Sequence, residues 1–168
     1  FSYKDFIHQL LKMLTEKSDI QVHLIPHVLY KHEDVDDDYA ICEYLKEVFP
    51  SVILPERFRT AFEAKSYISA MTLFTGARMH ATIGAISSGV PVIPVAYSRK
   101  FNGLYDTLQY PFYIDAKADI TLEQAIELFE DYMNKIDEMR NAVAVAQGIY
   151  SKKLKEYQNN LVKIFELK

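Results

Sequence analysis

Residues 72–103 read TLFTGARMHATIGAISSGVPVIPVAYSRKFNG, and this stretch decides the fold class. Residues 73–76 form a short apolar run that ends in glycine, which is typical of a buried strand leaving a sheet. Residues 77–88 place apolar side chains three or four apart, as on one face of a helix. Residues 90–97 are a second run, rich in β-branched residues. The order strand, helix, strand predicts a compact β-α-β unit with parallel strands and a right-handed crossover.

The predicted junction between the first strand and the helix carries Arg78 and His80. Open α/β sheets bind ligands at the carboxyl ends of their strands, so this junction is the candidate site. The guanidinium of Arg78 can bind a carboxylate or phosphate through two N–H groups, and a helix N-terminus adds partial positive charge. The imidazole of His80 can transfer a proton near neutral pH, although a histidine at a helix start can also be purely structural. The two side chains lie about 200° apart on a regular helix, so they converge only if the first turn is irregular.

The end of the second predicted strand adds polar groups at the mouth of the same crevice. Four such residues follow it directly: Tyr97, Ser98, Arg99 and Lys100. They bring two hydroxyls and two cations, and Gly103 beyond them permits a close approach of backbone to ligand. The alternative is that the basic pair is a solvated surface feature. The chain contains neither G-x-G-x-x-G nor a P-loop, so it lacks the signatures of dinucleotide and Walker-type phosphate sites.

The rest of the chain alternates between helical and extended patterns. Helical spacing predicts helices near residues 3–17, 39–49 and 60–71, and short extended runs predict strands at 20–28, 52–54 and 112–114. Residues 98–109 are expected to form a loop and a short helix. Asp119 and Thr121 are candidate caps of a long helix that Gly148 interrupts, before a last helix over residues 149–165. The fold class is therefore α/β, with a doubly wound, mostly parallel sheet and long C-terminal helices.

The beginning of the chain departs from the usual order of such a sheet. A doubly wound sheet begins with a strand, but here a helical pattern follows Phe1 almost at once. A strand lost upstream of Phe1 would occupy the middle of the sheet and leave a gap. We expect either a partner segment in that place or a different strand order. Residues 1–168 are predicted to form a single α/β domain.

An acidic run, Val35-Asp36-Asp37-Asp38, directly precedes the helical pattern at residues 39–49. Acidic side chains at a helix N-terminus cap N–H groups and offset the helix dipole. The alternative is that one aspartate holds a sugar hydroxyl or orients a catalytic group. A metal site is not expected, because no histidine lies at ligand spacing beside the run.

Composition limits the class of protein further. The chain has 168 residues, 49% hydrophobic and 25% charged, which is a globular composition long enough for a core. The net charge of −4 argues against a general nucleic-acid binder. The single cysteine, Cys42, cannot form an intramolecular disulfide, which fits a reducing cytoplasm, and its apolar helical setting indicates a buried structural thiol. No apolar run reaches the ~18 residues that a transmembrane helix needs.

The run GARMHATIGAISSGVPVIPVAYSRKFNG resembles the signature region of the polysaccharide pyruvyl transferase family. Members carry a similar R-x-H, a small-residue helix, G-x-P with an apolar strand, and Y-x-x-K followed by a glycine. The likeness extends more loosely back to Ile25-Pro26-His27 and Asp36–Asp38 and forward to about Ile114. It implies an enzyme that takes a pyruvyl group from phosphoenolpyruvate and attaches it as a ketal across two sugar hydroxyls. The acceptor would be a surface glycan or its lipid-linked precursor, as in exopolysaccharide biosynthesis.

The resemblance also implies roles for the site residues. His80 would be the catalytic or donor-contacting histidine, and Arg78 and Lys100 would bind the anions of the donor, with Tyr97 and Gly103 as further substrate-binding positions. Phosphoenolpyruvate is then the donor substrate, and the scheme requires no cofactor and no metal.

The implied fold is similar to the two-domain GT-B glycosyltransferase architecture, a Rossmann-like fold of which this chain would be the C-terminal half. A missing N-terminal domain would supply the acceptor site, so the isolated chain is expected to be inactive. The expected location is the cytoplasm, with the full enzyme associating peripherally with the inner face of the membrane. Two alternatives stay open: the donor-binding half of a sugar-nucleotide glycosyltransferase, and a non-catalytic α/β module that binds an anionic ligand or partner.

Overall fold

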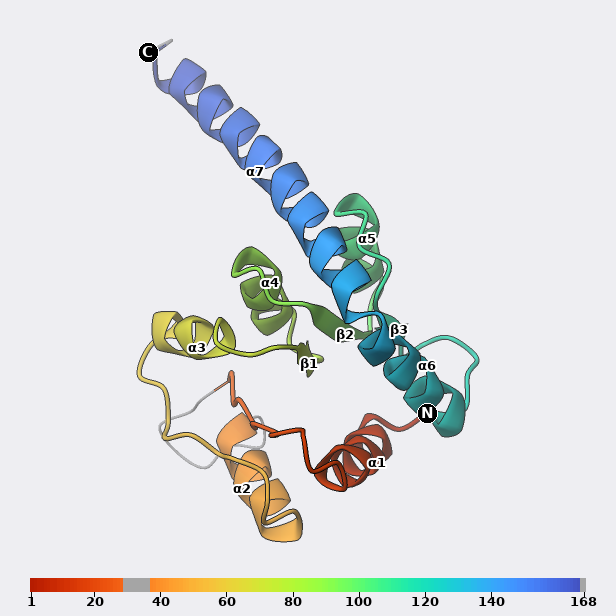
Figure 1. Cartoon of the computed structure of the whole chain (residues 1–168). Coiled ribbons are helices and arrows are strands. Elements are labelled where there is room, and N and C mark those ends of the chain that lie inside the picture. The colour runs from red at the N-terminus through yellow and green to blue at the C-terminus, as the bar shows by residue number, and fades with distance from the viewer. Residues whose placement is uncertain (29–36, 167–168) are drawn as a thin grey trace.

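The computed structural model describes residues 1–28 and 37–166, and Figure 1 shows how their elements are arranged. Within these residues lie seven helices and three strands: α1 (Tyr3–Thr15), α2 (Asp38–Val48), α3 (Ala61–Ile68), β1 (Phe74–Gly76), α4 (Met79–Ser87), β2 (Val92–Ala96), α5 (Arg99–Thr107), β3 (Ile114–Asp115), α6 (Leu122–Asn134) and α7 (Ile136–Glu166).

The central β-α-β unit forms as predicted. β1 and β2 are parallel, with Phe74 opposite Val92, and α4 connects them. Gly89 ends α4 with φ at +82°, a backbone conformation that favours glycine. β3 joins β2 in parallel on its other side, so the strand order is β1-β2-β3. The predicted α/β class with a parallel sheet is therefore confirmed.

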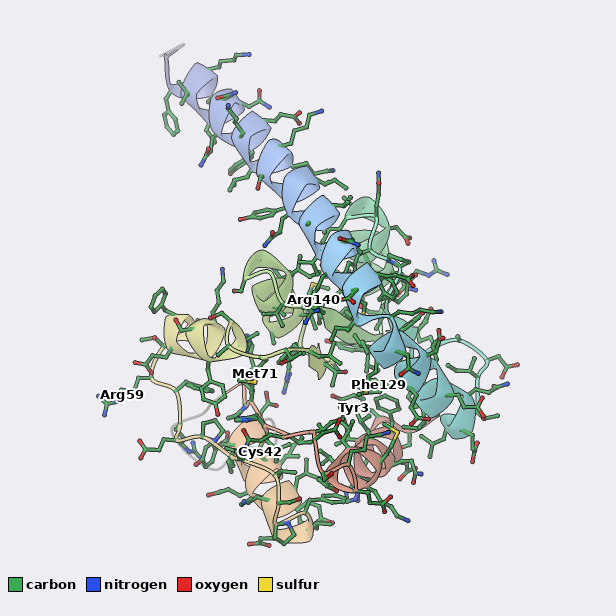
Figure 2. All side chains as sticks on the ribbon, in the orientation of Figure 1. Tyr3, Cys42, Arg59, Met71, Phe129 and Arg140 are labelled. Carbon is green, nitrogen blue, oxygen red and sulfur yellow. The ribbon has the colours of Figure 1, made fainter. Side chains whose placement is uncertain are left out.

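Helices cover both faces of this sheet, as a doubly wound fold requires. Figure 1 shows α4 and α5 above the strands and α1 below them. All five residues of β2, between these layers, are buried. Below the sheet, Phe6 of α1 packs edge-on against Phe129 of α6, with ring centroids 6.4 Å apart. Figure 2 shows Phe129 pointing into the molecule, whereas Arg59 points away from it.

The predicted strands at 20–28 and 52–54 do not form as regular strands. Both segments are extended, but they meet at a single parallel bridge between His23 and Ile53. Two hydrogen bonds of 2.8 Å hold it, from the Leu24 N–H to the Ile53 carbonyl and from the Ile53 N–H to the Val22 carbonyl. Neither segment pairs with β1 in the described chain, so the longer one lacks the second neighbour that a central strand has. Among the described residues, the extended pair therefore stands apart from the β1-β2-β3 sheet, and the two explanations expected from the sequence, a partner segment or a different strand order, stay predictions.

The break between the two C-terminal helices, α6 and α7, lies at Lys135 and not at Gly148, where the sequence predicts it. α6 ends before Lys135, which adopts φ −105° and ψ 28°, and α7 then runs unbroken for 31 residues. The predicted interruption at Gly148 is wrong, because a glycine inside a helix costs only about 1 kcal/mol and packing elsewhere along α7 outweighs it.

Side-chain caps define where two of the predicted helices begin. Thr121 caps α6 through a reciprocal capping box with Gln124, so the candidate cap at Asp119 is wrong. Thr60 caps α3, which ends at Ile68, three residues earlier than its predicted end at Met71.

The hydroxyl of buried Tyr110 takes the place of a strand neighbour for β2. It accepts the Val92 N–H at 3.1 Å and donates to the Val92 carbonyl at 2.8 Å.

We expect Tyr110→Phe to lower the free energy of unfolding by about 1–3 kcal/mol, because two buried backbone groups lose their partner. Urea denaturation measures this change. Tyr157→Phe, on the exposed part of α7, is the matched control and should change stability by less than about 0.5 kcal/mol; equal effects of the two substitutions would contradict the role of Tyr110.

Candidate functional site

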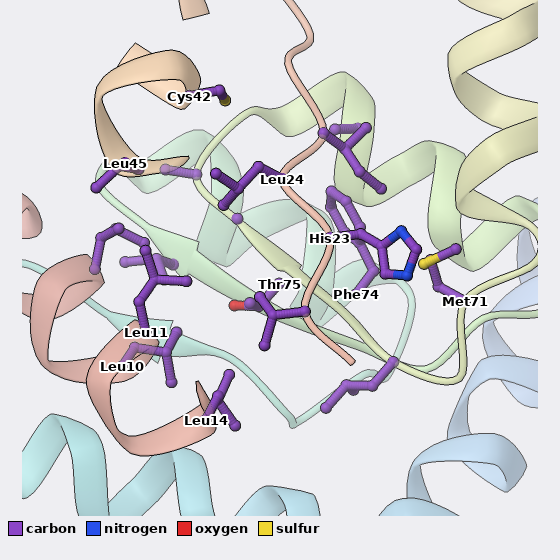
Figure 3. Close-up of a pocket in the computed structure, with 18 of the residues that line it drawn as sticks. Leu10, Leu11, Leu14, His23, Leu24, Cys42, Leu45, Met71, Phe74 and Thr75 are labelled. Carbon is purple, nitrogen blue, oxygen red and sulfur yellow. The ribbon is translucent and has the colours of Figure 1, made fainter. Parts of the chain in front are cut away.

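The carboxyl ends of the three strands open onto one large cavity. β1, β2 and β3 end at Gly76, Ala96 and Asp115, and the residues that follow them, Ala77, Tyr97 and Ala116, all line the cavity. Its volume is about 1390 Å³, and Figure 3 shows part of its wall. The carboxyl edge of the sheet, where a ligand of an α/β protein is expected, therefore borders this cavity.

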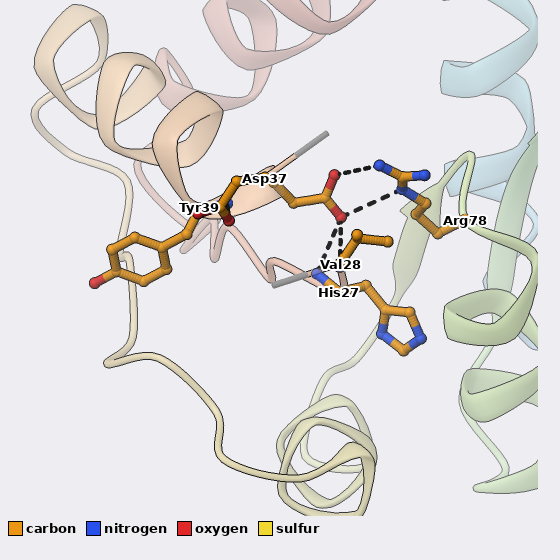
Figure 4. Close-up of polar contacts among 6 residues, drawn as sticks. His27, Val28, Asp37, Tyr39 and Arg78 are labelled. Atoms are coloured by element: carbon orange, nitrogen blue, oxygen red, sulfur yellow. Dashed lines mark hydrogen bonds and ion pairs between the residues drawn. The ribbon is translucent and has the colours of Figure 1, made fainter. Parts of the chain in front are cut away.

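The strongest polar contact at this edge joins Arg78 to Asp38. The Arg78 Nη2 lies 2.7 Å from Asp38 Oδ1, and its Nε lies 3.3 Å from Oδ2, as Figure 4 shows. Arg78 is the N-cap of α4, with extended dihedral angles (φ −83°, ψ 112°), so α4 begins only at Met79. Arg78 therefore lies outside the regular helix, as N-cap residues ordinarily do, so the separation of about 200° expected for two residues within one regular helix does not apply to Arg78 and His80.

Asp38 also organises the end of the extended segment. Its Oδ2 accepts the backbone N–H of His27 at 3.2 Å and that of Val28 at 2.8 Å. Its neighbour Asp37 caps α2 by accepting the Tyr39 N–H at 3.0 Å, and it forms an ion pair with Arg57 at 3.1 Å. Helix capping is therefore confirmed for Asp37. Asp38 contacts the guanidinium of Arg78, and the alternative, that an aspartate holds a sugar hydroxyl or orients a catalytic group, stays a prediction. Asp36 and Val35 of the acidic run lie outside the described residues.

His27 is a site residue that sequence reasoning did not single out. Its Nδ1 is buried and has no hydrogen-bond partner among the described residues. Burial lowers the pKa of His27 below its ordinary value of 6.5, and the charges of His80 and Arg78 lower this pKa further, while Asp38 opposes the shift. The signal in the sequence was the Ile25-Pro26-His27 strand end, which pointed to a boundary but not to its neighbours.

The structure brings only some of the predicted site residues to the cavity wall. Arg78 and Tyr97 line it, and Tyr97 is 53% exposed with its ring 5.1 Å from that of Phe101. His80 and Lys100 are the exposed second residues of α4 and α5, and neither lines the cavity. Gly103 lies within α5, where an added Cβ would meet nothing within 4 Å, so this position has no steric need for glycine.

The N-termini of α4 and α5 differ from those of the capped helices. α1, α2, α3 and α6 each have a side-chain cap and an acidic residue in the first turn. α4 and α5 have neither, although their N-cap positions are occupied by Arg78 and Ser98. Each begins directly after a strand of the same sheet, so their N–H groups and partial positive charges lie at the same edge. This arrangement suits an anionic ligand.

Three other features bear on the chemistry of the chain. Burial, with nearby Asp38 and Asp37, raises the pKa of the Cys42 thiol to about 12, so the thiol is protonated at neutral pH. In residues 1–28 and 37–166, no group of three or more His, Cys, Asp or Glu side chains could hold a metal ion. The helices of the described chain include none that is long and apolar enough to cross a bilayer.

Comparison with known families shows the family to which the chain belongs. The family model described as polysaccharide pyruvyl transferase matches residues 1–99, which is more than half of the 168 residues. The chain belongs to the polysaccharide pyruvyl transferase family. The match includes Arg78, His80 and Tyr97 and ends before Lys100 and Gly103. Neither a search of curated proteins nor one of solved structures found a significant match.

The buried imidazole of His27 makes stability depend on pH. Because its folded pKa lies below the ordinary value of 6.5, the unfolded chain binds more protons in this window, and the free energy of unfolding falls as the pH falls through it. We expect the melting temperature to drop less in His27→Gln than in the wild type between about pH 7.5 and about pH 5.5. His8→Gln on α1 is the matched control and should keep the wild-type dependence. An unchanged pH dependence in His27→Gln would contradict this role.

Proposed function

We propose that the full-length protein transfers a pyruvyl group from phosphoenolpyruvate to two hydroxyls of a sugar in a surface polysaccharide or its lipid-linked precursor. Membership of the polysaccharide pyruvyl transferase family supports pyruvylation in general. The observation that carries the donor is the pair of N-termini of α4 and α5, which lack side-chain caps and acidic residues. Phosphoenolpyruvate carries a carboxylate and a phosphate, and two such N-termini at one sheet edge suit two anionic groups.

The charged residues around these N-termini fit the same donor. The planar guanidinium of Arg78 has the geometry to bind a carboxylate or phosphate through paired N–H groups, and its pairing with Asp38 holds it in place. Lys100, at the beginning of α5, can bind the other anionic group as a point charge. Tyr97 lies between them in sequence, on the cavity wall, and its exposed hydroxyl is available to the substrate.

The reaction that we propose needs only proton transfers. The methylene carbon of phosphoenolpyruvate gains a proton and becomes a methyl group, while two sugar hydroxyls form bonds to C2 and the C2–O bond to phosphate breaks. One hydroxyl proton balances the proton added to the methylene carbon, and the other leaves with the phosphate. His80 is the proposed proton donor or acceptor, because an imidazole transfers protons near neutral pH. No cofactor or metal is needed for this balance.

The domain organisation that we propose is that of a C-terminal half. The cavity edge carries residues suited to the donor, and we assign the acceptor sugar to an N-terminal domain that faces it, as in a GT-B-like enzyme. We further propose that the enzyme works in the cytoplasm, at the inner face of the membrane, where a lipid-linked acceptor would be available.

The role of His80 is tested by phosphate release from phosphoenolpyruvate with sugar acceptors, using the full-length protein. We expect His80→Ala to lower kcat by about 10²–10⁴-fold, which is the usual contribution of general acid–base catalysis. His8→Ala is the control for a lost imidazole and should keep wild-type kcat. Undiminished activity in His80→Ala would contradict the role, and a thermal shift with nucleotide sugars but none with phosphoenolpyruvate would favour a glycosyltransferase.

The role of Arg78 predicts a different kinetic signature. We expect Arg78→Ala to raise the KM for phosphoenolpyruvate by at least about tenfold, because an anion contact made in the ground state is lost. Arg140→Ala removes an exposed arginine that pairs with Asp137 on α7, and it should leave KM within about twofold. If both substitutions leave KM unchanged, the donor does not bind at Arg78.

A further inference from the structure

Two extended parts of the chain face each other across the cavity: β1, which pairs with β2, and the segment around His23, which pairs with Ile53. Each has backbone groups that point into the gap between them. In β1, the Phe74 N–H donates to the Pro91 carbonyl at 2.9 Å. Alternation along a strand then turns the N–H and C=O of Thr75 to the opposite edge. In the other part, Leu24 and Val22 bond to Ile53, so the N–H and C=O of His23 are turned away from Ile53.

The cavity described above lies between these two edges. Its wall includes the residues of both, from Val22 to Ile25 and from Leu73 to Gly76. Apolar side chains of α1, among them Ile7, Leu10 and Leu14, line it from below. Its volume of about 1390 Å³ exceeds the ~300–1,000 Å³ of ordinary small-molecule pockets. An apolar space bordered by two rows of backbone donors and acceptors has the chemistry of a place for a β-strand.

The direction of such a strand follows from the positions of the carboxyl ends of β1 and of the extended segment around His23. Asp38 joins Arg78, just after β1, to the His27 backbone at the end of the extended segment, so both edges end on the same side. Tyr3, at the beginning of α1, and Ala77, just after β1, both line the cavity on that side. A parallel strand through the gap would therefore end next to the first turn of α1, within reach of the ~2–6-residue loops of β-α units.

We propose that this cavity is filled by a parallel β-strand contributed by the chain that immediately precedes Phe1 in the full-length protein. The strand pairs with His23 on one side and Thr75 on the other, and it joins the two parts into one sheet. The resulting order places the first strand between the second and the fourth, as in the 3-2-1-4-5-6 order of doubly wound sheets. Because it is covered on both faces, it is expected to be a run of Val, Ile and Leu. This inference does not depend on pyruvyl transfer.

Amide hydrogen exchange in the full-length protein tests the proposal without an activity readout. We expect the amides of Thr75 and His23 to exchange within about tenfold of those of Phe74 and Leu24, which already donate to Pro91 and Ile53. Rates typical of unprotected amides at Thr75 and His23 would overturn the proposal.

A cysteine pair distinguishes the occupants of the gap. Neighbouring strands are about 4.8 Å apart and strands on either side of a third are about 9.6 Å apart, whereas a disulfide needs Cα atoms within about 7 Å. We therefore expect His23→Cys/Thr75→Cys, made in a Cys42→Ser background, to form no disulfide within the full-length chain. An intramolecular disulfide would mean that the gap closes on itself, and a disulfide between two chains would mean that a second copy fills it. Either result would overturn the proposal, and neither would bear on phosphoenolpyruvate as the donor.

Discussion

The carboxylate of Asp38 connects the extended segment to the end of β1, two parts that no strand pairing joins among the residues described. One of its oxygens accepts two backbone N–H groups at the end of the extended segment, and both oxygens contact the guanidinium of Arg78 beyond β1. The side chain of Asp38 is 19% exposed, so water competes only in part for its carboxylate. Asp38 therefore joins Arg78 to the end of the extended segment across the carboxyl end of the cavity.

The two helices that begin at this rim are fixed to each other from within. The buried hydroxyl of Tyr105 on α5 donates to the hydroxyl of Thr82 on α4 at 2.6 Å. Both helices also pack against β2, whose residues are all buried. Their N-termini are consequently held at fixed positions relative to the strand ends. A site built in this way places partial positive charge by backbone geometry and uses side chains such as Arg78 to add specificity.

Local patterns were enough to predict the β-α-β unit. The apolar periodicity of its strands and helix, and the turn at Gly89, each depend only on residues that are close in sequence. The pairing of Arg78 with Asp38 could not be predicted, since 40 residues separate them and the sequence does not distinguish Asp38 from Asp36 and Asp37 as a partner. The break at Lys135 instead of Gly148 reflects tertiary packing, which buries Met139 of α7 completely and keeps the helix intact beyond it.

α7 has one further consequence. At ~1.5 Å per residue its 31 residues span about 46 Å, but its contact with α4 is made near Gln147, whose Nε2 donates to the Ile86 carbonyl. The next residue is Gly148, where the intrinsic preference for helix is lowest. Beyond it the helix is exposed and carries apolar side chains such as Tyr157 and Phe165. The residue with the lowest helix propensity therefore lies next to the contact with α4. We expect a force on the exposed C-terminal part of α7 to bend the helix at Gly148 before it disturbs the core.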